Sequence, residues 1–252
     1  MMIAIGAFYA KGNNNSEDYF LGGRKLNGFV AALSAQASDM SGWLLMGLPG
    51  AIYLTGVGGD GWIAIGLFIG TTLNWLFIAT KLRRYTIRAN NSVTLPTYFE
   101  NRFHDEKKVL MTVSSITIVV FFLVYCASAL SAGGQLFESV FGIDYHVALT
   151  IGALVVLVYT FLGGFTAVCV TDFIQGMLML VGILAVPLFA YHFLTIGGTT
   201  LSAGLEASGA DSANFLNLMK NGDGSNNIVS VISGLGWGLG YFGMPHILVR
   251  FM

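Results

Sequence analysis

The chain has 252 residues, of which 55% are hydrophobic and 10% are charged, and its formal net charge is −1. A soluble domain carries roughly 25% charged residues, so this composition excludes an ordinary water-soluble globule. The near-zero charge excludes the basic surface that nucleic-acid binding needs. Several apolar runs reach the about 20 residues that a helix needs to cross a bilayer, so we expect an all-α, polytopic membrane protein.

Taken in chain order, the apolar segments predict one partial and six complete spans. The partial one, 1–10, is about half the length of a crossing and lacks the basic start and cleavage site of a signal peptide. The complete spans are expected near 28–57, 62–80, 109–137, 147–168, 173–196 and 227–249. The connections are expected near 11–27, 58–61, 81–108, 138–146, 169–172 and 197–226.

The basic residues predict the orientation of these spans. Alternation places nearly all of them on one side, namely Lys11, Arg24, Lys25, Lys81, Arg83, Arg84, Arg88, Arg102, Lys107, Lys108 and Arg250. Lys220 is the exception. Because basic residues in short loops stay on the cytoplasmic side, we expect the richer side to be cytoplasmic.

The strongest functional signal is Asp39, which lies in the polar stretch 34–43 of the first complete span. An acid at the bilayer centre costs roughly 2.5–3.5 kcal/mol on insertion scales, so it normally faces a partner, an ion or a wet cavity. The surrounding Ser and Gly residues favour a local break, and carbonyls freed at a break can bind a hard cation. The alternative is that Asp39 only hydrogen-bonds to a neighbouring helix.

A second interruption is predicted in the last span, where glycines and Pro245 crowd the stretch 233–245. Each Gly disfavours helix by about 0.8–1 kcal/mol relative to Ala, and Pro also removes a donor. Trp237 and Tyr241 are four residues apart, so on a helical piece they would share a face and could wall a pocket. The alternative is a closely packed helix crossing with aromatic filler. Two interrupted spans far apart in sequence indicate a transporter with discontinuous helices at its binding site.

A third feature, 163–175, joins two spans with almost no polar loop, and we expect Thr171 or Asp172 to cap the second helix. Enzyme signals are weak. His104, His146, His192 and His246 have no metal-ligand spacing, and nothing resembles a nucleophile elbow or a P-loop. We therefore expect neither an enzyme nor an organic cofactor. Cys126 and Cys169 lie in or beside apolar runs, where cysteine behaves as a small hydrophobe, so no disulfide is expected.

At these features the sequence resembles a known family of membrane transporters. The matching segments are Leu21-Gly22-Gly23-Arg24, the run from Ala37-Ser38-Asp39 to Leu48-Pro49-Gly50, Leu95-Pro96, Tyr125-Cys126-Ala127-Ser128, Thr171-Asp172, and the run from Gly236-Trp237 to Phe242-Gly243. They resemble the sodium:solute symporter family, and within it the proline-transporting branch. The resemblance implies a leucine-transporter-like fold of two inverted five-helix repeats, with 28–57 and 227–249 as its interrupted core helices.

The resemblance also implies a function and a set of site residues. Family members couple inward sodium flow to solute uptake, here of L-proline, across the bacterial cytoplasmic membrane. The carbonyls of Ala37 and Met40 would bind sodium, with Asp39 and Ser41 needed for the sodium response. The residues implied to bound the substrate pocket or its gate are Ser41, Gly42, Trp43, Tyr125, Trp237, Tyr241 and Pro245, and Arg24 would lie on the cytoplasmic pathway.

Two departures from the family pattern limit what the resemblance implies. Met244 stands where better-studied members carry a polar Gln, and the chain has about half the family's length. We therefore expect an N-terminal half, cut at both ends, that holds the first repeat and the first helix of the second but only part of the sodium site. The alternatives are a symporter for another small solute and a half-length membrane protein that does not transport.

Overall fold

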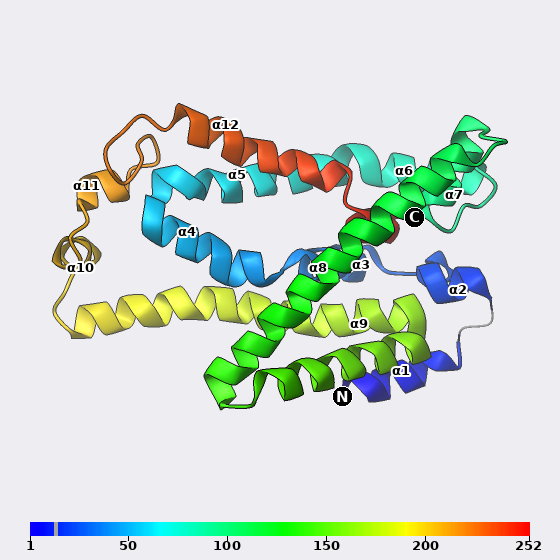
Figure 1. The fold of residues 1–252 in the computed structure, drawn as a ribbon, viewed down its shortest axis with the longest axis horizontal. Coiled ribbons are helices and arrows are strands. Elements are labelled where there is room, and N and C mark those ends of the chain that lie inside the picture. The colour runs from blue at the N-terminus through cyan, green and yellow to red at the C-terminus, as the bar shows by residue number, and fades with distance from the viewer. Residues whose placement is uncertain (13–14) are drawn as a thin grey trace. The chain divides into compact units, whose positions relative to one another are not determined.

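The computed structural model describes residues 1–12 and 15–252, and these residues are almost entirely helical (Figure 1). No strand occurs within those two ranges, where the β geometry is limited to an isolated bridge between Lys220 and Asn226. The chain divides into two compact units. Unit 1 consists of 1–42, 79–176 and 245–252, and unit 2 consists of 43–78 and 177–244.

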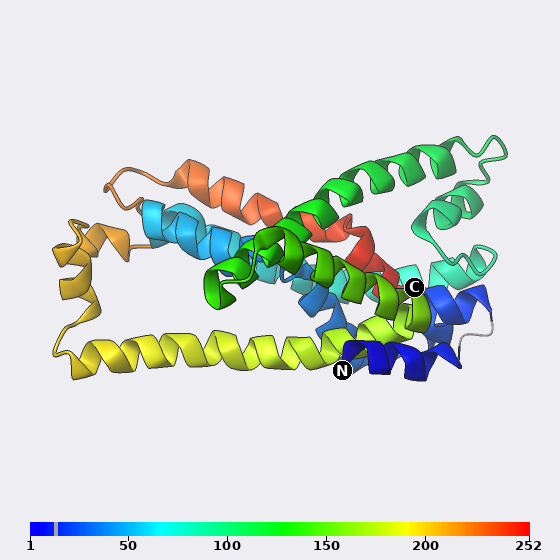
Figure 2. The same cartoon turned by 60° about the horizontal axis from the view of Figure 1, so that its bottom comes forward.

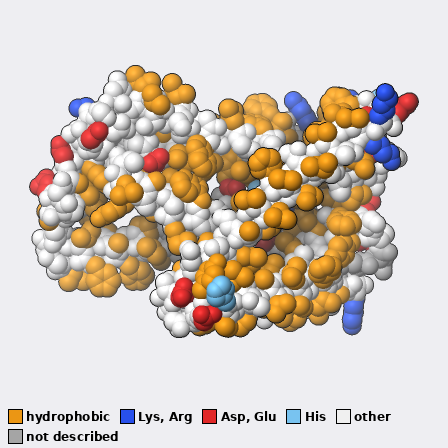
Figure 3. Space-filling model, viewed as in Figure 1, with side chains coloured by type: hydrophobic (Ala, Val, Ile, Leu, Met, Phe, Trp, Pro, Cys, Tyr) orange, Lys and Arg blue, Asp and Glu red, His pale blue; other side chains and the backbone are white. Residues whose placement is uncertain are grey.

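Unit 1 contains the N-terminal helices, the longest uninterrupted helix and the C-terminus. Its elements are α1 (Met2–Ala10), α2 (Ser16–Leu21), the 3₁₀ turn η1 (Gly22–Arg24), α3 (Gly28–Asp39), α6 (Thr80–Arg88), α7 (Leu95–Phe103), α8 (Val109–Phe141), α9 (Tyr145–Ile196) as far as Gly176, α13 (Pro245–Leu248) and the 3₁₀ turn η5 (Val249–Phe251). Side chains such as Val113, Val120 and Phe121 are exposed on α8, and hydrophobic atoms cover the visible face of this helix (Figure 3). This apolar exterior fits a helix surrounded by lipid.

The chain reverses direction within α9, at Gly164 (Figure 2). Gly164 has φ 60° and ψ −157°, a conformation that residues with a Cβ rarely adopt. The expected spans 147–168 and 173–196 therefore meet at Gly164, and the connection that we expected at 169–172 is wrong. Thr171 lies inside the second arm, where its hydroxyl donates to the carbonyls of Ala167 and Val168, so it is not a cap.

Small residues hold the first arm of α9 close to α1. A Cβ added to Gly6 would lie 2.8 Å from the carbonyl oxygen of Tyr159, and one added to Gly163 would lie 2.8 Å from the Cα of Gly6. Membrane helices use small residues in this way because close backbone approach provides the packing that drives their association.

Unit 2 is built around α5 (Val57–Asn74) and α12 (Ile228–Gly236), which run side by side (Figure 1). The unit also contains a π-helical turn (Trp43–Gly47), α4 (Leu48–Thr55), part of a second π-helical turn (Trp75–Ala79), the end of α9, α10 (Leu201–Ala207), α11 (Ser212–Phe215) and the 3₁₀ turn η4 (Trp237–Phe242). The expected connection at 58–61 is wrong, because α5 already begins at Val57 and only Gly56, with φ +82°, separates it from α4.

Glycines form the interface between α5 and the α12–η4 segment. A Cβ on Gly66 would overlap the carbonyl of Gly234, and a Cβ on Gly70 would overlap the backbone of Gly238. Several glycines of the last interrupted segment therefore serve close packing. The alternative interpretation of the last interrupted segment, a closely packed helix crossing, is therefore correct for the side that faces α5.

Three helices in the described ranges are long and apolar enough to cross a membrane. They are Val57–Arg88, Val109–Phe141 and Tyr145–Ile196, and a fourth crossing is counted if Ile228–Phe242 and Pro245–Phe251 form one broken span. With the reversal at Gly164, the 52-residue helix provides two arms. The all-helical membrane fold expected from composition is confirmed, while the full set of crossings and their orientation stay predictions.

Candidate functional site

The first interruption lies at the end of α3, where the sequence predicts it. The helix ends at Asp39, and Met40 has the extended conformation φ −68°, ψ 90°. The amide of Met40 donates to the carbonyl of Gln36 over 3.2 Å. Because the hydrogen-bond ladder of α3 ends there, the carbonyls of Ala37 and Asp39 come after its last acceptor. The break is confirmed, and it supplies backbone oxygens beside an acid.

The predicted sodium-binding residues lie together around this break in unit 1. Ala37 is buried, and Asp39, Met40 and Ser41 are half-buried. The described residues contain no group of three or more His, Cys, Asp or Glu side chains that could hold a metal. A cation at the break would therefore need carbonyl and hydroxyl oxygens as well as a carboxylate, and such oxygens are suitable ligands for hard cations.

A buried ion pair in unit 1 was missed by the sequence analysis. Asp172 lies within α9, and one of its carboxylate oxygens is 2.8 Å from Arg250 Nη2. The same oxygen accepts hydrogen bonds from Ser34 at 2.8 Å and from Ser38 at 3.0 Å. Arg250 Nε also donates to Ser34 over 2.8 Å. The four side chains link α3, α9 and η5, so Asp172 is a tertiary anchor and not a helix cap.

One available signal could have identified this pair. Asp172 follows an apolar run, and an acid inside a membrane segment is by default a candidate for function or for pairing with a base. Because Thr171 precedes it, the Thr171-Asp172 pair resembles a helix-capping motif. Arg250, 78 residues further on, closes the last apolar run and was used only to predict orientation.

The second interruption separates η4 from α13 at Gly243 and Met244, as the sequence predicts. Trp237 and Tyr241 do not share a face, because η4 has about three residues per turn and side chains four apart diverge. Tyr241 is 3% exposed, and its carbonyl accepts from Asn74 Nδ2 over 2.9 Å. Trp237 is 45% exposed and stacks on Trp43, with 5.6 Å between ring centroids and 10° between planes.

Near the second interruption, unit 1 places Tyr125 of α8 against α13. The ring of Tyr125 stacks on that of His246, with centroids 5.7 Å apart and an interplanar angle of 23°. Phe122 lies against the same imidazole with 5.4 Å between ring centroids and an interplanar angle of 60°. Nε2 of His246 is 3.7 Å from Oδ1 of Asp39. The structure therefore brings two predicted site residues, Asp39 and Tyr125, to one histidine that the sequence did not single out.

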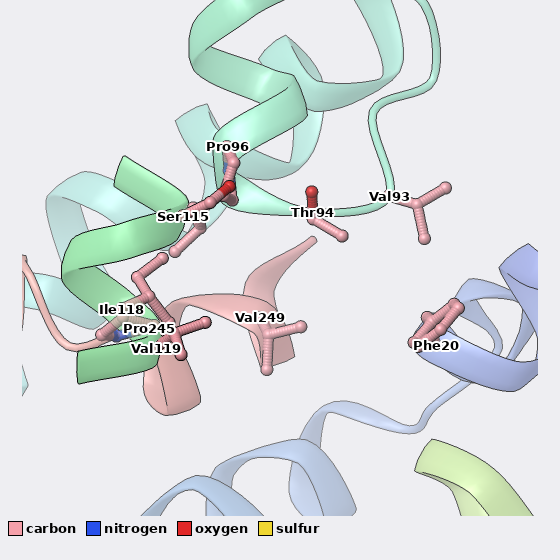
Figure 4. A pocket seen from close by; sticks show the side chains of 10 residues that line it. Phe20, Val93, Thr94, Pro96, Ser115, Ile118, Val119, Pro245 and Val249 are labelled. Carbon is pink, nitrogen blue, oxygen red and sulfur yellow. The ribbon is translucent and has the colours of Figure 1, made fainter. Parts of the chain in front are cut away.

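Pro245, another predicted substrate residue, borders an apolar cavity in unit 1 (Figure 4). The cavity has a volume of about 370 Å³ and is lined by Phe20, Val93, Thr94, Leu95, Pro96, Ser115, Ile118, Val119, Pro245 and Val249. No charged side chain belongs to this lining as described. A zwitterion needs charged or strongly polar partners, so this cavity is not suited to bind one.

Arg24 is 7% exposed and lies in a polar network of unit 1. Its guanidinium is 3.0 Å from Glu17 and 2.9 Å from the side-chain oxygen of Asn91, and it also donates to Thr86 and to the carbonyl of Ser92. A hydrogen bond from Asn91, with a smaller contribution from the charge of Arg24, lowers the pKa of Glu17. The network ties α2 to α6 and to the turn after it.

Comparison with known proteins places this geometry in context. The model of the sodium:solute symporter family matches residues 19–252. The chain is 49% identical over 251 residues to a sodium/proline symporter of Salmonella typhimurium, and 48% identical over 251 residues to the high-affinity proline transporter PutP of Bacillus subtilis. All of the chain is aligned in both cases, to 48% and 51% of the two relatives. The chain thus spans about half the length of these curated relatives.

A solved structure supports the fold independently of close sequence similarity. A substrate-bound, outward-open sodium-coupled sialic acid symporter matches 99% of the chain with a TM-score of 0.75 and 21% sequence identity. The match covers 51% of that symporter's chain. The leucine-transporter-like fold expected from the resemblance is therefore confirmed.

Proposed function

The chain belongs to the sodium:solute symporter family, and we propose that it takes part in sodium-coupled uptake of L-proline across the cytoplasmic membrane of a bacterium. The observation that carries this proposal is the identity of 45–49% along the whole chain to relatives named sodium/proline symporter or proline transporter. The relatives are transporters, so the proposed role involves no chemical catalysis and no organic cofactor.

Sodium is proposed to bind at the end of α3. The carbonyls of Ala37 and Met40 are its direct ligands, and Asp39 and Ser41 are required for the sodium response. The extended conformation of Met40 supports this assignment, because it takes backbone oxygens out of the helical ladder. A cation such as sodium needs several oxygens around it, so these residues form part of a site.

We propose substrate-contacting residues in each of the two units. In unit 1 they are Ser41 and Gly42 at the break, Tyr125 on α8 and Pro245 at the start of α13. In unit 2 they are Trp43, Trp237 and Tyr241. The exposed Trp43–Trp237 stack supports its part of the proposal, because it offers apolar ring faces to a small cyclic solute.

In the proposed mechanism, sodium binding orders the interrupted segments and thereby raises the affinity for proline. By linkage, bound proline raises the affinity for sodium by the same factor. Alternating exposure of the site to the two sides of the membrane then carries both solutes inward. The sodium gradient drives accumulation because the two ligands bind cooperatively.

Uptake by cells tests this proposal directly. The protein is expressed from its own gene in a bacterium that lacks proline transporters, and entry of labelled L-proline is measured with sodium and with choline as the replacement cation. We expect uptake that requires sodium and is blocked by excess unlabelled proline. Uptake of another solute with no competition by proline would contradict the assignment of substrate, and sodium-independent uptake would contradict the coupling.

A further inference from the structure

Asn74 is a fully buried polar side chain in the apolar packing of unit 2. It is the last residue of α5 and is 0% exposed, and its Nδ2 donates to the carbonyl of Tyr241 over 2.9 Å. Its Oδ1 is buried without a hydrogen-bond partner among the residues that the structure describes. Nearly all buried polar atoms in proteins are satisfied, because an unsatisfied one is costly. An apolar residue would pack here at lower cost, so the hydrogen bond to Tyr241 accounts for the amide.

The acceptor of this hydrogen bond is a carbonyl at the second interruption, where the helical ladder ends. The last bond of η4 runs from the amide of Gly243 to the carbonyl of Gly240 over 3.0 Å, and the carbonyl of Tyr241 comes next. In a continuous α-helix that carbonyl would accept from the amide four residues on, but residue 245 is a proline and has no N–H. Asn74 supplies a donor in place of the one that Pro245 lacks.

The packing of α5 brings the amide of Asn74 within reach of η4. Gly66, Gly70 and Asn74 are spaced four apart, so they lie on one face of α5. On this face a Cβ at Gly70 would overlap the backbone of Gly238, so the two backbones are in close contact. The residues directly after Asn74, 75–79, form a π-helical turn, a departure from α-helix that is frequent at functional sites. The closely packed face of α5 therefore ends in one polar group at the end of η4.

The carbonyl of Tyr241 belongs to the segment that carries two of the proposed substrate-contacting rings. Trp237 begins η4 and stacks on Trp43, and Tyr241 lies near the end of the same six-residue turn. Hydrogen bonds in a 3₁₀ turn have poorer geometry than those in an α-helix, so a short turn of this kind is weakly held by its own backbone. A side-chain hydrogen bond at its end therefore helps to fix where both rings lie.

We propose that Asn74 is a positioning residue for the substrate pocket, because its amide holds the carbonyl of Tyr241 and thereby sets the positions of Trp237 and Tyr241. This inference rests on the proposed function and adds to it a residue that acts on the backbone of the pocket and not on the substrate. Without this hydrogen bond the end of η4 occupies its binding arrangement for a smaller fraction of the time. The apparent affinity for proline falls in proportion to that fraction.

Asn74→Leu tests this role with little change in side-chain volume. The carbonyl of Tyr241 loses its donor from Asn74, but the unsatisfied Oδ1 is removed as well, so the two effects on stability oppose each other. The unfolding temperature of the purified protein should therefore change by less than about 3 °C. Equilibrium binding of labelled proline in saturating sodium should weaken by about two- to tenfold, the factor expected for one hydrogen bond.

Asn227 provides a matched control in the same unit. It is 3% exposed, and its Nδ2 donates to the carbonyls of Gly58 over 2.8 Å and Leu218 over 2.7 Å, at the opposite end of α5 from Asn74. Asn227→Leu removes both hydrogen bonds and should lower the unfolding temperature by about 2–12 °C. Its proline affinity should stay within about twofold of the parent value, because η4 keeps its donor. The two variants thus separate positioning of the pocket from stability.

The outcomes distinguish failure of this inference from failure of the proposed function. Unchanged proline affinity in Asn74→Leu, or an equal fall in both variants, would overturn the inference alone. No proline binding by the unaltered protein would overturn the proposed function, and this inference with it. If Asn74→Leu does not fold, Asn74→Ala and Asn227→Ala are compared in the same two assays, since both lack a donor and leave the same space. Proline affinity should fall further in Asn74→Ala, and equal affinities would exclude the positioning role.

Discussion

Removing either charge of the Asp172–Arg250 pair should destabilise the protein strongly, and removing both should not. Asp172→Asn leaves a guanidinium whose side chain is 5% exposed without its counter-charge. Arg250→Met leaves a carboxylate that is 12% exposed and that keeps, among the described residues, the hydroxyls of Ser34 and Ser38 as donors. In both variants an uncompensated charge stays buried.

The magnitude follows from the cost of a buried unpaired charge. Breaking such a pair from one side costs about 3–5 kcal/mol, whereas neutral residues of similar volume on both sides often cost little or nothing. At about 2–4 °C per kcal/mol for a protein of this size, each single variant should unfold roughly 6–20 °C lower than the parent. The double variant Asp172→Asn with Arg250→Met should recover most of that loss.

Thermal unfolding of the purified protein in detergent, followed by fluorescence, measures these shifts. Glu106→Gln is the matched control, because Glu106 is exposed and losing its charge should leave the unfolding temperature nearly unchanged. Strictly additive losses in the double variant would mean that the two charges do not stabilise each other. Single variants as stable as the control would refute the burial of the pair.

Three further predictions concern other parts of the molecule. Asp39→Asn should raise the sodium concentration needed for half-maximal proline binding by about tenfold, while the unfolding temperature changes little. An unchanged sodium affinity would count against the proposed sodium site. Gly70→Ala should destabilise the protein by about 1–3 kcal/mol because the added methyl meets the backbone of η4. Gly236→Ala should be tolerated, because the space around its Cβ is open. Equal unfolding temperatures for the two variants would exclude the tight crossing. The pKa of Glu17 is lowered in the folded state, so its contribution to stability should be complete above the ordinary value of 4.5 and lost as the pH falls through the lowered pKa. Asn91→Ala should shift that loss of stability to higher pH, as measured by thermal unfolding across a pH series. If the loss occurs at the same pH in the variant, the hydrogen bond from Asn91 does not lower the pKa of Glu17.

Both interruptions were predictable from sequence because their causes are local. Gly and Pro lower helix stability wherever they stand, and an acid such as Asp39 is costly in a bilayer whatever surrounds it. Interruptions within 34–43 and 233–245 were therefore predictable without tertiary information, and the structure places them after Asp39 and at Gly243. The same local reasoning failed at 163–175, where polar Thr171 and Asp172 looked like a turn and Gly164 made the actual reversal.

The missed partnerships depend on contacts between distant segments. Asp172 finds Arg250 across 78 residues, and His246 meets Asp39 and Tyr125 only when α3, α8 and α13 are packed together. A list of histidines searched for metal-ligand spacing could not find His246, since its environment consists of aromatic rings and one carboxylate. Sequence indicates where a chain cannot remain regular helix, whereas the structure shows which side chains meet there.

We propose that sodium and proline bind cooperatively to this protein, and reciprocal equilibrium binding measures this cooperativity. Proline affinity is measured with and without saturating sodium, and sodium affinity is measured with and without saturating proline. Linkage requires the two factors to be equal, and we expect an increase of about five- to 150-fold in each. Proline binding with the same affinity in the presence and absence of sodium would exclude this cooperativity.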